Sequence, residues 1–255
     1  MRTNATLVIN PKGGSGKTTV ASNLASYFAT QKLRTAMLDY DAQGSSLNWL
    51  RLRAPQHPRI HGANAAPQQP GQLRSLAMHV PEDTQQLVID APAGACGLLL
   101  QEMLTRAHCI IIPVAPSAID IHATANFIRD LLLKGMIRSR NIRLAVVANR
   151  VRSSMPVYQP LERFLTSLNL PLLARLSDSD VFLKAAESGV GIFEMEFAVS
   201  VVERQQFQPI AEWVEMPQLI VDGKLPVRSA ATAPVRAGLR VVANAAASVP
   251  GFLRR

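Results

Sequence analysis

The stretch that most constrains the fold is NPKGGSGKTTV, residues 10–20, which follows a short apolar run, TLVIN, at 6–10. Its three glycines allow a tight turn in which backbone N–H groups approach a phosphate closely, at the positive end of a helix that begins at Lys17. Lys17 can reach the β- and γ-phosphates of a nucleotide, and the Thr18 hydroxyl can bind Mg²⁺. A strand, a glycine loop and a helix in this order predict a nucleotide site.

The rest of the chain repeats the same alternation of strand and helix. Apolar runs with strand character lie at 34–40, 59–65, 86–90, 109–115, 142–149 and 170–177. Helical patterns lie at 17–31, 45–52, 118–135, after Pro156, and at 201–216 with a break expected near Pro209. Near-continuous apolar strands separated by helices are typical of a sheet covered on both faces. We therefore predict an α/β, doubly wound, mainly parallel sheet with helices on both faces, of the P-loop NTPase kind.

Two segments differ in composition. Residues 1–216 carry the alternating pattern and are predicted to form one domain around the nucleotide site. Residues 217–255 are rich in Ala, Val and Arg, and we predict a basic C-terminal extension that is partly helical or flexible.

The charge of the chain points to an anionic partner. The 255 residues contain 27 Lys and Arg against 18 Asp and Glu, a net charge of +9, with clusters at 129–152 and 223–255. Such an excess fits nucleic acid or anionic lipid as a partner, or a solubilising surface charge. No apolar run approaches the roughly 20 residues needed to span a bilayer, so we expect a cytoplasmic protein. The two cysteines, Cys96 and Cys109, have no metal-type spacing and are interpreted as buried thiols.

Several blocks together resemble one known family. KGGSGKTT (12–19) resembles the deviant Walker A motif of the ParA/MinD family of ATPases. The resemblance runs from about Thr6 to Met195 and includes LDYDAQGS, LVIDAPAG, IIIPVAPSAIDIHATANFI, VVANRV and VFLKAAESGVGIFEM. The fit is best to small ParA-type proteins without an N-terminal DNA-reading domain, because the first strand begins at the start of the chain. The resemblance implies ATP and Mg²⁺ as cofactors and ATP hydrolysis, slow without a partner, as the reaction.

A second lysine, Lys12, precedes the glycines of the loop. In the family that this motif resembles, the lysine at the place of Lys12 reaches across a dimer interface to the phosphates of the other subunit's ATP. Two facing triphosphates bring many negative charges together, and a cation from each side offsets them. The alternative is a solvated loop lysine. The predicted catalytic residues are Lys12, Lys17 and Asp41.

Carboxylates end two of the predicted strands. By resemblance, Asp90 is the Walker B acid associated with Mg²⁺, Asp41 positions or activates the attacking water, and Asp39 supports the metal shell. Ala42 stands where the family has a proline, so the loop lacks that restraint on φ. The predicted metal-site residues are Thr18, Asp39 and Asp90.

Asn149 ends another predicted strand. By resemblance it hydrogen-bonds the adenine, and a turn asparagine is the alternative. The predicted nucleotide-binding residues are Gly13, Gly14, Ser15, Gly16, Lys17, Thr18, Thr19 and Asn149.

The resemblance implies a positioning ATPase as the first functional hypothesis. ATP closes a homodimer, the dimer binds DNA non-specifically on the nucleoid, and a ParB-like or adaptor protein stimulates hydrolysis and release. The cargo would be a plasmid, a chromosome region or a protein organelle. The predicted DNA-binding residues are Arg152, Arg163, Arg175, Arg228, Arg236 and Arg240.

Two other hypotheses belong to different classes. A MinD-like regulator would bind a membrane through its end, where Phe252 and Leu253 lie beside arginines, but Pro250 and Gly251 interrupt the helical pattern, so membrane binding is not expected. An electron-transfer or metal-carrier relative would need paired cysteines, and Cys96 has no second cysteine in spacing.

Overall fold

The computed structural model describes residues 3–66, 78–133, 137, 140–152 and 158–216. These lie within a compact unit, Met1–Met216. The predicted extension at 217–255, with Arg228, Arg236 and Arg240, lies outside the described residues, so its structure stays a prediction.

The centre of the fold is a seven-stranded sheet in which every strand pair is parallel. The strand order is β3-β2-β4-β1-β5-β6-β7. The strands are β1 (Asn4–Val8), β2 (Thr35–Asp39), β3 (Ile60–Asn64), β4 (Gln86–Asp90), β5 (Cys109–Val114), β6 (Arg143–Val151) and β7 (Leu172–Ser177). The chain runs from the central strand β1 to the β3 edge, returns through β4, and then adds β5, β6 and β7 on the other side of β1. The direction in which strands are added therefore reverses at β1. Ligands of open parallel sheets bind at such a point.

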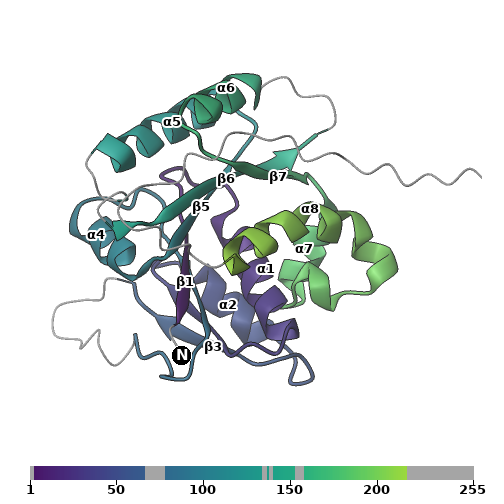
Figure 1. Ribbon diagram of the computed structural model, residues 1–255. Helices are drawn as coiled ribbons and strands as arrows, with labels where there is room; N and C mark the ends of the chain where they lie inside the picture. Colours follow the sequence, from purple (N-terminus) through teal and green to yellow (C-terminus); the bar gives the residue numbers. More distant parts are fainter. Residues whose placement is uncertain (1–2, 67–77, 134–136, 138–139, 153–157, 217–255) are drawn as a thin grey trace, which may run out of the picture. The chain divides into compact units, whose positions relative to one another are not determined.

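Helices cover both faces of the sheet (Figure 1). One layer holds α4 (Gly97–Arg106), α5 (Ala118–Leu133) and α6 (Gln159–Ser167). The other holds α1 (Lys17–Thr30), α2 (Ser45–Leu52), α7 (Asp180–Glu187), the 3₁₀ turn η3 (Ile192–Glu194) and α8 (Phe197–Glu215). The predicted doubly wound α/β fold is confirmed.

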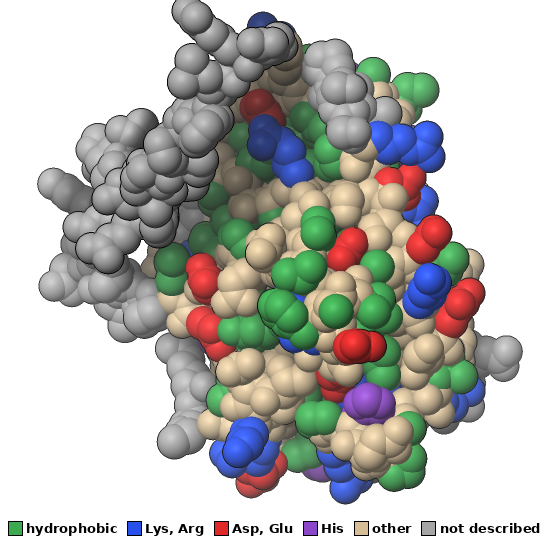
Figure 2. Space-filling view, turned by 90° about the vertical axis from the view of Figure 1, so that its right-hand side faces the viewer, with side chains coloured by type: hydrophobic (Ala, Val, Ile, Leu, Met, Phe, Trp, Pro, Cys, Tyr) green, Lys and Arg blue, Asp and Glu red, His purple; other side chains and the backbone are tan. Residues whose placement is uncertain are grey.

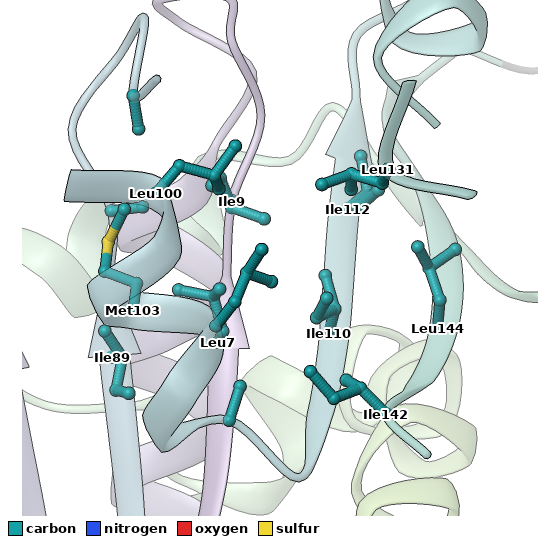
Figure 3. Close-up of a cluster of buried hydrophobic side chains, with 14 of the residues drawn as sticks. Leu7, Ile9, Ile89, Leu100, Met103, Ile110, Ile112, Leu131, Ile142 and Leu144 are labelled. Carbon is teal, nitrogen blue, oxygen red and sulfur yellow. The ribbon is translucent and has the colours of Figure 1, made fainter. Parts of the chain in front are cut away.

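Two hydrophobic cores separate these layers because side chains alternate between the faces of a strand. On β1, Leu7 packs toward α4 and α5, whereas Val8 packs toward α1 and α8. Figure 3 shows part of the first core, where Leu7 of β1 lies between Ile89 and Ile110 of the neighbouring strands and Met103 of α4 lies on the Ile89 side. The central strands are therefore apolar on both sides, as the sequence pattern predicts.

Some sequence predictions need correction. The strand at 172–177 is an edge strand and only partly buried, because it pairs with β6 alone among the described strands. Helix α8 continues through Pro209 without the expected break, since Phe207 and Ile210 are fully buried on either side of it. Cys96 is exposed rather than buried, while Cys109 is buried as predicted.

Helix boundaries also differ in places. Helix α4 was not predicted, because its sequence GLLLQEMLTR is short and begins with a glycine. The expected helix start at Pro156 and helix end at Gly135 lie outside the described residues. Helix α2 has the predicted bounds, 45–52.

Candidate functional site

The glycine loop connects the central strand β1 to helix α1, as the motif predicts. Gly14 and Gly16 have positive φ values of 73° and 92°, in the region that favours glycine. Gly16 is the N-cap of α1 and makes no side-chain cap hydrogen bond. A Cβ on Gly16 would lie 1.9 Å from Asn149 Nδ2, whereas one on Gly13 or Gly14 would meet nothing within 4 Å. The outer part of the loop thus presents open backbone, and its base is closed against β6.

The front of the loop is fixed by Asn10, which the sequence analysis missed. Its Oδ1 accepts from the backbone N–H of Lys12 at 2.9 Å. Its Nδ2 donates to the carbonyl of Pro113 at 2.7 Å and to Thr124 Oγ1 at 3.0 Å. Asn10 is fully buried. It therefore ties the segment that carries Lys12 to β5 and α5, and an Asn before a Pro gives no sequence signal beyond a turn.

Lys17 lies within the loop and is largely buried. Its Nζ donates to the Lys12 carbonyl at 3.0 Å, and the Ser15 hydroxyl donates to the same oxygen at 3.2 Å. Burial lowers the pKa of Lys17, and the carboxylates of Asp90 and Asp41 oppose that change. The Lys17 ammonium, held in a partly desolvated loop, is well placed to donate its hydrogen bond to a phosphate oxygen instead of to the Lys12 carbonyl.

Lys12 stands apart from Lys17. Its side chain is half-buried, and its ammonium makes no ion pair or hydrogen bond with any described residue. The loop therefore offers two cations with different environments, one tied into the loop and one without a partner in the described chain.

Asp90 lies at the end of β4 and is almost completely buried. Its Oδ2 accepts from Thr18 Oγ1 at 2.8 Å and, in a short contact, from Ser46 Oγ. Its Oδ1 is buried with no hydrogen-bond partner. Burial raises the pKa of Asp90 to about 7, and the two hydroxyls oppose that change. A buried carboxylate oxygen without a partner, beside a loop threonine, fits a Mg²⁺–nucleotide site.

The described residues hold no cluster of three or more His, Cys, Asp or Glu side chains suited to a metal. This agrees with the chemistry of Mg²⁺, which keeps several waters and uses one or two protein ligands plus phosphates. Thr18 and Asp90 are the predicted metal residues that the structure brings together.

Asp39 lies beside Asp90, because β2 and β4 place the two residues in register. Its Oδ1 accepts from the Asp41 N–H at 3.0 Å, and its Oδ2 accepts from the N–H groups of Ser46 and Leu47 at 3.0 and 3.2 Å. Burial raises the pKa of Asp39, and these backbone bonds oppose that change. Both oxygens thus hold the start of α2 and the preceding loop.

Asp41 lies in the loop between β2 and α2 and is half-buried. Its Oδ1 accepts from the Gln43 N–H at 3.0 Å, which closes a local turn. The Asp41 carboxylate is one of the two charges that oppose the lowering of the Lys17 pKa. The role of Asp41 in positioning a water stays a prediction.

Asn149 contacts the glycine loop directly. Its Nδ2 donates to the Ser15 carbonyl at 3.0 Å, and the side chain is buried. The register of β6 shifts between Ala148 and Val151, and Arg150 has a φ of 53°. Such a bulge redirects a side chain, and here Asn149 supports the loop. The bond to Ser15 is a contact that neither sequence interpretation of Asn149 foresaw.

The predicted DNA-binding arginines that the structure describes are exposed, and two of them are paired. Arg152 binds Asp178 at 3.0 Å, and Arg175 binds Glu162. Arg163 lies on the exposed side of α6. On the face shown in Figure 2, described Lys and Arg side chains lie among Asp and Glu side chains rather than in a separate basic patch.

Two arginines of the basic cluster at 129–152 that the structure describes, Arg143 and Arg152, lie far apart. Arg143 begins β6, donates to the carbonyls of Trp213 and Val214, and stacks on the Trp213 ring with 4.6 Å to the centroid. Arg152 follows the other end of that strand, roughly 30 Å away at about 3.3 Å per residue. Arg143 therefore serves the packing of α8 against the sheet.

The parallel sheet has a glycine loop after its central strand, a lysine ammonium inside that loop and a threonine–aspartate hydrogen bond beside it. This arrangement is that of a P-loop nucleotide-binding protein. The family model described as "CobQ/CobB/MinD/ParA nucleotide binding domain" matches residues 6–192. The chain belongs to this family and is a ParA/MinD-type ATPase, a class in which ATP hydrolysis is the family reaction.

Individual relatives agree with this assignment. The chain is 24% identical over 193 residues to "Maintenance of carboxysome distribution protein A" of Halothiobacillus neapolitanus, covering 74% of this chain and 86% of that protein. It is 28% identical over 148 residues to "Chromosome-partitioning ATPase Soj" of Thermus thermophilus, covering 48% and 59%.

Solved structures show the same fold. An ATP complex of McdA from Cyanothece superposes with a TM-score of 0.64 at 14% identity, covering 86% of this chain and 99% of that one. The septum site-determining protein MinD of Pyrococcus horikoshii, bound to Mg-ADP, has a TM-score of 0.61 at 17% identity, covering 84% and 96%. In the described part of this chain, no helix has the length and apolar character to cross a membrane.

Proposed function

We propose that this chain is an ATP-dependent positioning protein whose homodimer is closed by ATP. The observation that carries the proposal is Lys12, a loop lysine with no partner in the described chain, held by Asn10 at the open end of a loop that already has its own phosphate lysine, Lys17. The triphosphate bound to a second copy of the chain supplies an anionic partner for the Lys12 ammonium.

The residues of one protomer divide the work at the site. Backbone N–H groups of 13–18 and the Lys17 ammonium bind the phosphates, and Thr18 with Asp90 holds Mg²⁺, which when bound offsets the phosphate charge. Asp41 orients the attacking water and accepts its proton at a carboxylate oxygen. Asp39 fixes the loop that carries Asp41 through the Asp41 N–H. Hydrolysis is slow until a partner protein completes this arrangement.

Non-specific DNA binding on the nucleoid is the second part of the proposal. Of the 27 Lys and Arg, six lie in 217–255 beside a single acid, Asp222, so more than half of the net +9 belongs to this segment. Arg152 and Arg175 each already have a carboxylate partner, whereas Arg163 has no ion pair among the described residues. We therefore assign most of the DNA affinity to the extension, with Arg228, Arg236 and Arg240.

The cargo is proposed to be a protein organelle. The relative of Halothiobacillus neapolitanus, covered over 86% of its length, is named for carboxysome distribution, whereas the chromosome-partitioning relative is covered over 59%. The stimulating partner is then an adaptor on that organelle.

Lys12→Ala and Lys17→Ala test the dimer. We expect Lys17→Ala to lose nucleotide binding, because the phosphates lose a charged donor, and Lys12→Ala to bind ATP but stay monomeric in size-exclusion chromatography with light scattering. The control is Lys32→Ala, a substitution at an exposed lysine after α1. A Lys12→Ala protein that still dimerises with ATP contradicts the cross-subunit role.

A salt series tests the DNA partner. ATP-loaded protein should bind random duplex DNA with an affinity that falls steeply with salt, and a chain truncated after 216 should bind much more weakly. Anionic liposomes form the second arm. Liposome binding without DNA binding would replace this proposal with the MinD-like membrane function.

A further inference from the structure

Ser46 joins the two acidic strand ends of the site, although no sequence motif singled it out. It is the second residue of α2 and is fully buried. Its hydroxyl donates to Asp90 Oδ2, and its backbone N–H donates to Asp39 Oδ2 at 3.0 Å. One residue thus connects the start of α2 to the ends of both β2 and β4.

The contact matters because two hydroxyls share one carboxylate oxygen. Thr18 Oγ1 and Ser46 Oγ both donate to Asp90 Oδ2, while Oδ1 has no partner. If the Thr18 hydroxyl turns to a Mg²⁺–nucleotide, it no longer donates to Asp90. Among the described residues, Ser46 is then the one side chain that still donates a hydrogen bond to the Asp90 carboxylate. Ser46 then still orients the carboxylate after the Thr18 hydroxyl has left it.

Helix α2 is held firmly at its other end, so Ser46 cannot follow Asp90 freely. Arg53, the C-cap residue that follows α2, forms a buried ion pair with Glu194, with side chains 7% and 2% exposed. Arg53 Nη1 also donates to the Gly189 carbonyl at 3.0 Å. The hydroxyl of Ser46 is therefore presented from a fixed helix rather than from a mobile loop.

We propose that Ser46 is a positioning residue for the Mg²⁺–nucleotide site, which holds the Asp90 carboxylate and links it to the loop that carries Asp41. The inference rests on the proposed nucleotide function. Residues that orient a metal-associated ligand typically change metal affinity by about 10–100-fold when they are removed. The loop 40–44 lies between Asp39 and α2, so a loosened Ser46 also loosens Asp41.

Ser46→Ala is compared with Ser45→Ala, a control at an exposed position in the same helical turn. The full chain is titrated with Mg²⁺ in the presence of a fluorescent ADP analogue, and binding is also measured in EDTA. We expect Ser46→Ala to raise the Mg²⁺ concentration for half-maximal binding by about tenfold or more, with the affinity in EDTA unchanged. Ser45→Ala should match the wild type, and Ser46→Thr, which keeps a hydroxyl, should approach it.

The outcomes separate the inference from the proposed function. A Ser46→Ala protein with the wild-type Mg²⁺ dependence overturns the positioning role. Equal weakening with and without Mg²⁺ also overturns it, because that pattern indicates general damage to the loop. Failure of the wild-type protein to bind the analogue at all would instead remove the nucleotide function itself.

Discussion

The buried ion pair between Arg53 and Glu194 gives the sharpest stability prediction. The guanidinium and carboxylate form two hydrogen bonds, of 2.8 Å from Nη1 and 2.5 Å from Nη2. Arg53 also donates to the carbonyls of Gly189 and Pro58, and it lies 5.1 Å from the centroid of the Trp49 ring. The pair joins α2 to the 3₁₀ turn η3, which packs on α1 and α8.

Removal of Arg53 leaves the Glu194 carboxylate almost fully buried, and among the described residues only the Gly191 N–H still donates to it, at 2.9 Å. Breaking a buried pair on one side costs about 3–5 kcal/mol of unfolding free energy. For a domain of this size each kcal/mol lowers Tm by about 2–4 °C, so Arg53→Ala should lower Tm by about 6–20 °C. An Arg53→Met, Glu194→Leu protein should recover much of that loss, since neither charge is then buried alone.

Urea denaturation in EDTA without nucleotide measures this free energy free of ligand effects. Arg34→Ala is the matched control, because Arg34 pairs with Asp83 at the surface, with side chains 53% and 66% exposed, where a pair is worth about 0–1 kcal/mol. A loss below about 1 kcal/mol for Arg53→Ala, or a double variant as unstable as the single one, would refute the argument.

Two further predictions concern the site. Burial raises the pKa of Asp90 to about 7 in the folded chain, against about 3.9 in the unfolded chain. Between these pH values the folded chain binds one proton more than the unfolded chain. The nucleotide-free protein should therefore lose stability as pH rises from 4 to 7, by at most about 4 kcal/mol. Asp90→Asn should flatten that profile in denaturation at pH 5 and 7.5, and an unchanged slope would contradict it. Gly16→Ala should abolish nucleotide binding in calorimetry, because a Cβ there would lie 1.9 Å from Asn149 Nδ2 and the φ of Gly16 is 92°. Gly13→Ala is the control and should keep the native loop, because a Cβ on Gly13 would meet nothing within 4 Å. Equal binding by both variants would count against the loop geometry.

Much of the fold follows from the sequence because its signals are local. The apolar runs at 86–90 and 109–115 are long enough and β-rich enough to predict buried parallel strands, and the structure places strands there. The loop glycines and Lys17 follow one another in the chain, so their spacing alone predicts a phosphate site. Asp90 and Asp39 were placed at one edge because parallel strands end together.

Other features depend on residues that are distant in sequence. Pro209 is accepted inside α8 because buried contacts of the same helix offset the lost hydrogen bond, and no local pattern shows those contacts. The strand at 172–177 became an edge strand because strand order is set by the crossovers, not by composition.

At the site, the sequence by itself determined which groups can meet a nucleotide: a glycine loop, two lysines, a threonine and strand-end carboxylates. Only the tertiary structure decided which side chains hold them in place. Asn10 fixes the front of the loop, Asn149 closes its base and Ser46 holds Asp90, across separations of 103 or more, 134 and 44 residues. Such hydrogen bonds form between strands and helices that folding brings together, and a single chain read in order carries no local signal for them.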